Sequence, residues 1–420
     1  MRMPHIRNRL LSPLVLESLK WSPAVGVFGL RQTGKTTLVK DLVRKKVGEY
    51  ETFDSGVVLD ASRETPELFC TRPKLLCIDE AQRAPWIFPA IKNLIGTQRR
   101  PGQFLLTGSV RFTLKKEIHE ALTGRIVLHE LLPFNPAEAH GQKASSVLSD
   151  LFELLRRRTR SVEAFRKYFS STQARMTPSQ ILHHMVVGGL PIPCFTRDEH
   201  QRVSWYNGYF ETLIGRDLPL VDESLDNISF SQGISFLRQL SLMQGKEVGL
   251  SDLARAGSLT LAKAKKIVYA LAALSLVDLL PPETATENAT RKLRIAWKDI
   301  GLWNHLMGVP RHILGRDSTA LGVMISQELR TQVSLMGKTV LWSSYRHRNG
   351  AAIPWILKLG QSIIAMTQIS VESPKPYDYR ALKNFLAKQP HGIGLVFGAE
   401  KSPIMPLTES IWLVPYTWLF

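Results

Sequence analysis

One short segment, Val25–Leu38, constrains the fold more than any other part of the 420-residue chain. It reads VGVFGLRQTGKTTL, an apolar run followed by Gly29 and Gly34 and then by Lys35 and Thr36. Glycine readily adopts the backbone angles that let consecutive N–H groups point into one concave turn. A strand before such a turn and a helix after it are typical of a phosphate-binding P-loop. The segment therefore predicts an α/β fold with a nucleotide-phosphate site.

The residues of this turn are expected to contact the phosphates of ATP and the Mg²⁺ ion. The Lys35 ammonium group is expected to reach the β- and γ-phosphates, and the Thr36 hydroxyl to bind Mg²⁺. The start of the following helix adds partial positive charge at the same place. The other residues expected to line the phosphates are Gly29, Arg31, Gln32, Thr33, Gly34 and Thr37.

A second segment, Lys74–Glu80, supplies the acids that such a site needs. It reads KLLCIDE, an apolar strand that ends in two carboxylates. Asp79 is expected to hold the Mg²⁺ coordination shell, and Glu80 to polarise the attacking water. An acidic helix cap would explain Asp79 alone, but not both acids in register with a P-loop. The pair therefore predicts hydrolysis, with Lys35 and Glu80 as catalytic residues.

Two further candidates follow along the chain. Phe104–Ser109 reads FLLTGS, another buried strand with a polar end. Thr107 or Ser109 would face the γ-phosphate and sense it by hydrogen bonding, although Thr-Gly-Ser is also common in turns. Arg125 is a candidate catalytic charge donor to the transition state, from its own or a neighbouring subunit. A solvated surface arginine is the alternative.

The hydrophobic patterns divide the chain into three predicted domains. Up to about residue 140, short apolar runs alternate with helical patterns, which predicts a parallel sheet with crossover helices over residues 1–140. Residues 141–285 are predicted to be helical and to contain a helix-turn-helix, with Ser258 as the cap of its second helix. Residues 286–420 mix strands and helices, which predicts a third domain of the α/β class.

Taken in order, several segments resemble those of one protein family. GLRQTGKTTL, KLLCIDEAQ, FLLTGS and LTGRIVLHELLPFNPAE are similar to segments of prokaryotic AAA-type ATPases that carry a C-terminal domain of unknown function. The resemblance extends to Gly188–Pro191 (GGLP), Tyr209–Leu218 (YFETLIGRDL) and Asp299–Leu302 (DIGL). It implies a P-loop AAA-type parallel sheet, a winged helix in the middle domain and a restriction-endonuclease-like last domain.

The last domain departs from that family's pattern where a nuclease would need acids. The family commonly has Gly-x-Glu-x-Asp-Phe on one strand and Glu-x-Lys on the next. Here the matching stretches read GAAIPWI from Gly350 and AMTQIS from Ala365, with Thr367 and Ile369 in place of Glu and Lys. Metal-dependent phosphodiester cleavage needs clustered carboxylates. A domain lacking catalytic acids is therefore expected, acting as a scaffold or binding surface.

The overall charge favours an anionic partner. The chain has 54 Lys and Arg against 36 Asp and Glu, a net charge of +18. Nucleic acid is the first candidate and an anionic membrane surface the second. Solvated helix faces are the alternative at each proposed contact. The proposed DNA contacts are Thr260, Lys263 and Lys266 in the helix-turn-helix, and Arg157 and Arg158 in the basic stretch before it.

Cysteine usage and hydropathy give an expectation for location. Cys70, Cys77 and Cys194 have no spacing typical of disulfides or metal sites, which favours a reducing compartment. The longest apolar run, about residues 267–280, is too short to cross a bilayer, and no signal peptide is seen. A cytoplasmic protein without a membrane partner is expected.

Two functions from different classes remain open. The first is an Mg²⁺-dependent ATPase that couples its nucleotide state to DNA or to a DNA-associated protein partner. The second is a nucleotide-gated scaffold with little or no turnover, which recruits a protein partner when ATP is bound. If Arg125 acts between subunits, the protein must form a homo-oligomer.

Overall fold

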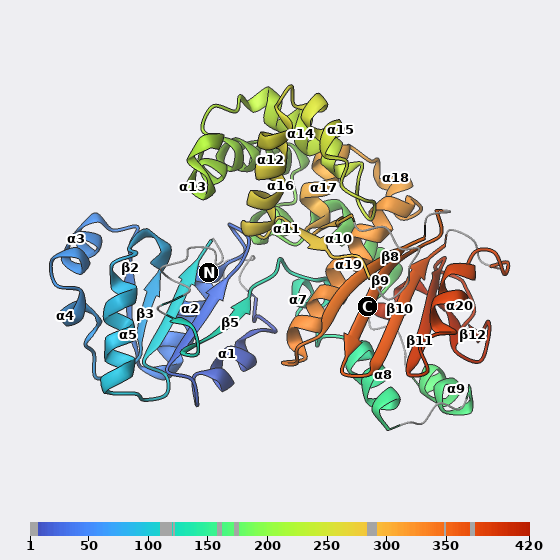
Figure 1. Ribbon diagram of the computed structural model, residues 1–420, viewed down its shortest axis with the longest axis horizontal. Coiled ribbons are helices and arrows are strands. Elements are labelled where there is room, and N and C mark those ends of the chain that lie inside the picture. The colour runs from blue at the N-terminus through green and yellow to red at the C-terminus, as the bar shows by residue number, and fades with distance from the viewer. Residues whose placement is uncertain are drawn as a thin grey trace.

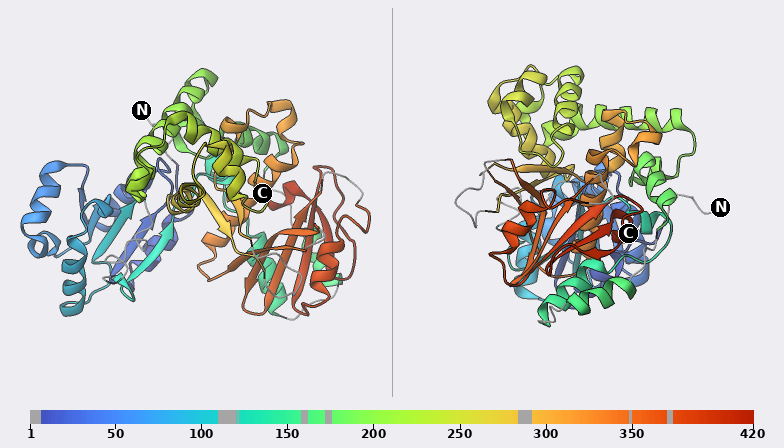
Figure 2. Two further views of the ribbon diagram at one scale, coloured as in Figure 1. Left: turned by 45° about the horizontal axis from the view of Figure 1, so that its top comes forward. Right: turned by 90° about the vertical axis from the view of Figure 1, so that its right-hand side faces the viewer.

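The computed structural model describes residues 7–109, 120, 122–157, 162–171, 176–283, 292–347, 350–369 and 374–420. Three parts can be followed in Figure 1: a blue α/β part, a green and yellow group of helices, and an orange-red part built on a sheet. In Figure 1 and in the left view of Figure 2, the blue and red parts lie on opposite sides and the helices lie above and between them.

Among the described residues, the N-terminal sheet has five parallel strands in the order β2-β3-β4-β1-β5. This confirms the predicted parallel α/β domain. The carboxyl ends of the strands meet at one edge, which is where ligands bind in open parallel sheets. The strands are β1 (Ala24–Phe28), β2 (Glu49–Thr52), β3 (Leu76–Asp79), β4 (Phe104–Gly108) and β5 (Ile126–Glu130).

Different helices cover the two faces of this sheet. Val25 and Val27 of β1 share one apolar cluster with α1 and α2, whereas Ala24 and Phe28 share another with α3, α4 and α5. Because both faces are covered, β1 is apolar at every position rather than alternating. The helices are α1 (Ser12–Ser18), α2 (Lys35–Lys46), α3 (Gly56–Glu64), α4 (Pro66–Cys70) and α5 (Ile87–Thr97).

The middle part consists mainly of helices, followed by a pair of antiparallel strands, β6 (Val277–Leu280) and β7 (Arg294–Trp297). Its helices include α10 (Pro178–Val187), α11 (Pro191–Phe195), α12 (Glu199–Thr212), the π-helix η3 (Leu213–Asp217), α13 (Leu218–Val221), α14 (Phe230–Ser241), α15 (Leu250–Ala256) and α16 (Leu261–Ala273). The helices α15 and α16 lie where the helix-turn-helix was predicted.

The cap of α16 differs from the prediction. Thr260 is the N-cap residue, and its side chain accepts a hydrogen bond from the Lys263 backbone N–H at 3.3 Å. Ser258 instead has a φ of +50°, the left-handed conformation of a turn residue. The prediction of Ser258 as the cap was therefore wrong by two residues, because the turn after α15 is longer than the pattern indicated.

The C-terminal sheet is mixed, and the order of its described strands is β12-β13-β11-β10-β9-β8. These strands are β8 (Leu341–Arg346), β9 (Ala352–Leu359), β10 (Ser362–Gln368), β11 (Gly392–Gly398), β12 (Met405–Pro406) and β13 (Ile411–Pro415). The helices between β7 and β13 are α17 (Ile300–Met307), α18 (Arg311–Leu314), α19 (Ser318–Leu335) and α20 (Arg380–Leu386). Within the described part of the chain, none of the helices is both long and apolar enough for a membrane crossing.

Two earlier helices, α8 (Val147–Arg156) and α9 (Val162–Ser171), lie beside this sheet (Figure 1). The Phe169 ring of α9 is centred 4.7 Å from the ring of Trp412 in β13 and 5.0 Å from that of Trp418. The chain therefore contributes to the C-terminal core both before and after the middle helices. The domain boundaries proposed at residues 140 and 285 stay predictions.

Candidate functional site

The turn between β1 and α2 has the backbone shape that its glycines permit. Gly29 has a φ of +149°, and a Cβ atom there would lie 2.3 Å from the Leu131 carbonyl oxygen. Gly34 has a φ of +90° and precedes α2, which begins at Lys35. A side chain at Gly29 would force Leu131 or the turn to move. The strand, turn and helix expected of a P-loop are all present.

Lys35 is buried at the centre of this turn. Its ammonium group donates hydrogen bonds to the carbonyl oxygens of Gly29 at 2.9 Å and Leu30 at 3.0 Å. Burial lowers the pKa of Lys35 to about 8, against the opposing effect of the nearby Glu80 and Asp79 carboxylates. A desolvated cation bonded to neutral carbonyl oxygens is well placed to attract an anion such as phosphate.

The other side chains of the turn differ in where they lie. Thr33 is buried and its hydroxyl donates to the Leu30 carbonyl oxygen at 2.8 Å, so its backbone rather than its side chain is left for phosphate. Gln32 and Thr37 are exposed. Arg31 extends to Asp217 of η3, and their nitrogen and oxygen atoms are 2.9 Å apart.

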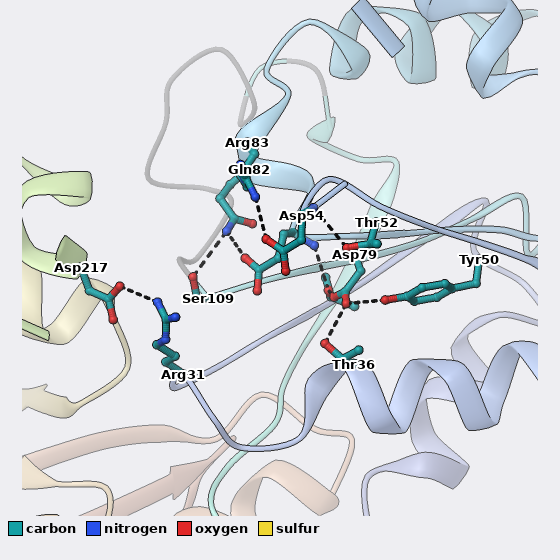
Figure 3. A network of polar contacts seen from close by, with 12 residues as sticks. Arg31, Thr36, Tyr50, Thr52, Asp54, Asp79, Gln82, Arg83, Ser109 and Asp217 are labelled. Atoms are coloured by element: carbon teal, nitrogen blue, oxygen red, sulfur yellow. Dashed lines mark hydrogen bonds and ion pairs between the residues drawn. The ribbon is translucent and has the colours of Figure 1, made fainter. Parts of the chain in front are cut away.

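Asp79 ends β3 and is surrounded by hydroxyl groups (Figure 3). Its Oδ2 accepts hydrogen bonds from Thr36 Oγ1 at 2.7 Å and from the Tyr50 hydroxyl at 2.8 Å. Its Oδ1 accepts one from Thr107 Oγ1. The structure thus brings together the two residues predicted to bind Mg²⁺, and Thr107 rather than Ser109 contacts the carboxylate.

Glu80 follows directly and has an unusual backbone conformation. Its φ is +56°, in the left-handed region that costs a non-glycine residue about 1 kcal/mol or more. The Gln82 amide donates to the Glu80 carboxylate and lies 3.4 Å from Ser109 Oγ (Figure 3). The Glu80 backbone N–H donates a hydrogen bond to Thr107 Oγ1 at 3.3 Å. Glu80 and Ser109 therefore lie on the same side of the site and share one amide.

Arg9 contacts the P-loop backbone and holds it in place. This role was not predicted from the sequence. Its guanidinium donates to the Thr33 carbonyl oxygen at 2.6 Å and to Glu138 Oε1 at 3.1 Å, and both charged side chains are buried. Glu138 belongs to α7 (Pro136–Ala139), in the segment that leaves the sheet. Sequence patterns gave no signal for this pair, because its partners are 129 positions apart.

Tyr50 was also missed, for a related reason. It lies on β2, and β2 is the neighbour of β3, with Thr52 in register with Asp79. A short strand reading EYET has no feature that assigns it to that position. Only the strand order brings the Tyr50 hydroxyl to the Asp79 carboxylate.

Arg125 lies away from the P-loop of its own chain. It directly precedes β5, and Ile126 is paired with Ala24 at the start of β1, whereas the P-loop follows the last residue of β1, Phe28. Arg125 is therefore at the amino end of the sheet and the P-loop at the carboxyl end. Its guanidinium donates to the Thr123 carbonyl oxygen at 3.2 Å.

Two of the residues predicted to contact DNA are paired with acidic side chains of the protein. Lys266 pairs with Asp222 at 3.0 Å and Arg157 with Glu153 at 3.0 Å. Thr260 is exposed at the start of α16, and Lys263 is half-buried one turn later. Arg158 lies outside the described residues.

Thr367 and Ile369, the residues found in place of the family's Glu and Lys, lie at one end of β10. Thr367 is near the end of β10, which pairs with β9 on one side and β11 on the other. Ile369 directly follows this strand. Across the described residues, no group of three or more His, Cys, Asp or Glu side chains could hold a metal ion.

Comparisons with known proteins agree with this geometry in the N-terminal part. A family model described as an AAA domain matches residues 22–140, and a model described as a domain of unknown function (DUF8612) matches residues 179–312. Two curated relatives, the uncharacterized proteins Rv2008c of Mycobacterium tuberculosis and Mb2031c of Mycobacterium bovis, are each 27% identical over 322 residues. The match covers 76% of this chain and 63%, less than two thirds, of those relatives.

Solved structures with some likeness include a Walker-type ATPase of Pyrococcus abyssi, at 14% identity and a TM-score of 0.40, covering 72% of this chain and 96% of that one. A DNA replication initiation factor matches at 15% identity and a TM-score of 0.25, covering 62% of this chain and 88% of that one. From the family matches and the parallel sheet with its P-loop, residues 22–140 are an AAA domain of the P-loop ATPase class, and the chain continues into a domain of unknown function.

Proposed function

We propose that this protein binds ATP with Mg²⁺ and hydrolyses it in the cytoplasm, coupling its nucleotide state to DNA or to a DNA-associated partner. One observation carries the ATPase proposal: Thr36, Asp79 and Glu80 surround the P-loop lysine. The Thr36 hydroxyl is 2.7 Å from the Asp79 carboxylate, and the Glu80 and Asp79 carboxylates are both close enough to Lys35 to raise its pKa against the effect of burial. The AAA domain match supports the same reaction class.

The oxygen atoms beside the P-loop fit Mg²⁺. This ion prefers oxygen ligands and is commonly bound by one or two carboxylates together with substrate phosphates. Thr36 Oγ1 and the Asp79 carboxylate are such a donor set and would hold the ion, with Thr107 and Tyr50 keeping Asp79 in place. When bound, Mg²⁺ neutralises charge on the β- and γ-phosphates.

Glu80, Lys35 and the P-loop backbone have the other roles in hydrolysis. Glu80 accepts a proton from the attacking water as its oxygen approaches the γ-phosphorus, and the Gln82 amide holds that carboxylate in place. Lys35 leaves its carbonyl partners for the phosphates and stabilises the negative charge that develops as the γ-phosphate departs. Backbone N–H groups from Gly29 to Gly34 hold the phosphates in line.

Steady-state ATP turnover and equilibrium ATP binding test this proposal. Lys35→Ala is expected to lose binding and turnover together, because it removes the cation of the site. Glu80→Gln should keep binding and lower turnover by at least about 100-fold, the usual contribution of a general base. Lys92→Ala, an exposed lysine of α5, is the control and should match the wild-type protein. Undiminished turnover in both site variants would overturn the proposal.

DNA coupling is supported by the charge and by the order of elements in the middle part. The helices α14, α15 and α16 are followed by the β6–β7 pair, the order of a winged helix, and the net charge is +18. Lys263→Gln should weaken binding of a fluorescent duplex and reduce the slope of log affinity against log salt by about 1. Lys92→Gln, outside this region, is the charge-matched control. Equal slopes in both variants contradict a Lys263 phosphate contact.

A second candidate, the nucleotide-gated scaffold, is favoured by one surface feature. The helix α16 exposes Leu261 and Tyr269, at 55% and 51% of their surfaces, with the exposed Lys265 between them. Exposed apolar side chains along one helix favour a protein partner over a phosphate backbone. Tight ATP binding without turnover in the wild-type protein, together with a change in assembly seen by light scattering, would select this candidate and exclude the ATPase.

A further inference from the structure

The carboxylate of Asp217 reaches the P-loop from the middle part of the chain (Figure 3). Its Oδ1 is 2.9 Å from Nη1 of Arg31, and the two side chains are 8% and 31% exposed. Asp217 is the last residue of η3, a π-helix inserted between α12 and α13. Such insertions are rare and frequently occur at functional sites. The P-loop thus holds an acid that comes from another part of the protein.

The charges around Asp217 are those that a phosphate group would meet. Arg31, Arg216 and Lys35 each lower the pKa of the Asp217 carboxyl, whereas burial, the largest influence, raises it. Lys35 in turn is bonded to the carbonyl oxygens of its own turn. Both P-loop cations therefore have acceptors from the protein itself, and a nucleotide must compete for them.

We propose that Asp217 is a resident counter-anion of the P-loop, which the triphosphate displaces from Arg31, so that ATP binding loosens η3 from the AAA domain. The inference rests on the proposed ATP site and adds its regulation. A phosphate oxygen forms strong charge-assisted bonds with a guanidinium, and it repels an ionised carboxylate held at the same place. The same exchange converts nucleotide binding into a change in the middle helices.

The direction in which Asp217→Asn changes the ATP affinity distinguishes displacement of Asp217 by ATP from a role in which Asp217 only holds Arg31 in place. Equilibrium ATP·Mg²⁺ binding is measured by calorimetry in the Glu80→Gln background, which prevents turnover. Displacement predicts about tenfold tighter binding for Asp217→Asn, equivalent to about 1.4 kcal/mol, because no anion has to leave. If Asp217 merely supports Arg31, the same variant binds ATP more weakly or unchanged, and the proposal fails. Glu211→Gln removes an exposed carboxylate of α12 and should leave the affinity unchanged.

The release of η3 is measured by pulsed electron spin resonance between spin labels on Asn93→Cys and His200→Cys, both exposed positions. ATP should lengthen or broaden this distance in the Glu80→Gln background. Arg31→Gln should give a similar distribution without ATP, because the ion pair is already absent, so this variant tests the proposal even if Asp217→Asn is poorly folded. If the distance is unchanged both with ATP and in Arg31→Gln, the inference is wrong. The proposed function is still supported in that case, provided that the protein binds ATP. Failure of the parent protein to bind ATP overturns both.

Discussion

At the scale of single residues, the charged side chains of the site form hydrogen bonds and ion pairs with other groups of the same protein. Lys35 is bonded to carbonyl oxygens and Arg31 to Asp217, while the Asp79 carboxylate is surrounded by hydroxyl donors. Each of these arrangements satisfies a buried group that would otherwise be costly to desolvate. Each also offers a bond that can be exchanged for a phosphate oxygen or for a metal ion. The chemistry of the site therefore depends on how readily these internal bonds are given up.

The pH dependence of ATP binding follows from Lys35. Burial lowers its pKa from 10.5 to about 8, so the free protein loses this charge as the pH rises through 8. Bound phosphate favours the charged form and raises the pKa again, so binding above pH 8 takes up a proton. ATP affinity should fall by roughly tenfold for each pH unit above that value.

Calorimetry in buffers of different ionisation enthalpy measures both the affinity and the proton uptake. Lys35→Arg is the control, because a guanidinium stays charged throughout this range. If the Arg variant has the same pH profile as the wild-type protein, another group is responsible and the assignment to Lys35 is wrong.

Thr107 should affect turnover without contacting the nucleotide directly. Its buried hydroxyl donates to Asp79 Oδ1 and accepts from the Glu80 backbone N–H, so it aligns both acids. Thr107→Val should reduce turnover by about 10- to 100-fold, as removal of a residue behind a metal ligand commonly does, and should raise the Mg²⁺ concentration needed for half-maximal activity. Thr107→Ser restores the hydroxyl and should recover most of the rate. A Thr107→Ser variant as slow as Thr107→Val would point to lost packing instead.

At the scale of elements, the segment after β5 joins the P-loop to the rest of the molecule. Its Glu138 pairs with Arg9, which also holds the Thr33 carbonyl oxygen of the P-loop. Asn135 donates to Glu328 of α19 at 3.0 Å. Phe134 donates its N–H to the Gly189 carbonyl oxygen at 2.7 Å. One short segment thus contacts the AAA domain, the middle helices and the C-terminal part.

Removing one partner of the Arg9–Glu138 pair should be strongly destabilising. Arg9→Ala leaves the buried Glu138 carboxylate without its cation, which commonly costs about 3–5 kcal/mol. The free energy of unfolding from urea titration measures this loss. The double variant Arg9→Met, Glu138→Gln removes both charges and should lose less than Arg9→Ala alone. An Arg9→Ala loss below about 1 kcal/mol, the range of exposed pairs, would contradict the role given to this contact.

The sequence predicted the local elements of the site better than its long-range contacts. The P-loop turn, β3 with Asp79 at its end and Glu80 after it, and the end of β4 were each predicted because strand and helix patterns are local. Tyr50, Arg9 and Asp217 were not found, because they meet their partners 29, 129 and 186 positions away. The contact of Lys266, a proposed DNA-binding residue, with Asp222 has no sequence signal either, because the two residues are 44 positions apart.

At the scale of the whole molecule, Arg125 and the P-loop occupy opposite ends of one sheet. The register of β5 with β1 separates them by the length of β1, on the order of 15 Å at the usual rise per residue. An arginine side chain does not bridge that distance within the chain. A catalytic role for Arg125 therefore requires a second copy of the protein, in a head-to-tail contact that joins the amino end of one sheet to the P-loop of the next.

Mixing two inactive variants tests this arrangement. Lys35→Ala lacks the P-loop cation and Arg125→Ala lacks the donated charge, so each homo-oligomer should be inactive or nearly so. In an equal mixture, a complete site forms where an Arg125→Ala subunit supplies the P-loop and a Lys35→Ala subunit supplies the arginine, and roughly a quarter of wild-type turnover should return if subunits exchange freely around a head-to-tail assembly. The control is Arg99→Ala, an exposed arginine after α5, which should be active alone. Arg125→Ala with full activity, or a mixture no more active than its components although light scattering detects mixed oligomers, would show that Arg125 is a surface residue and that each P-loop works without a neighbour.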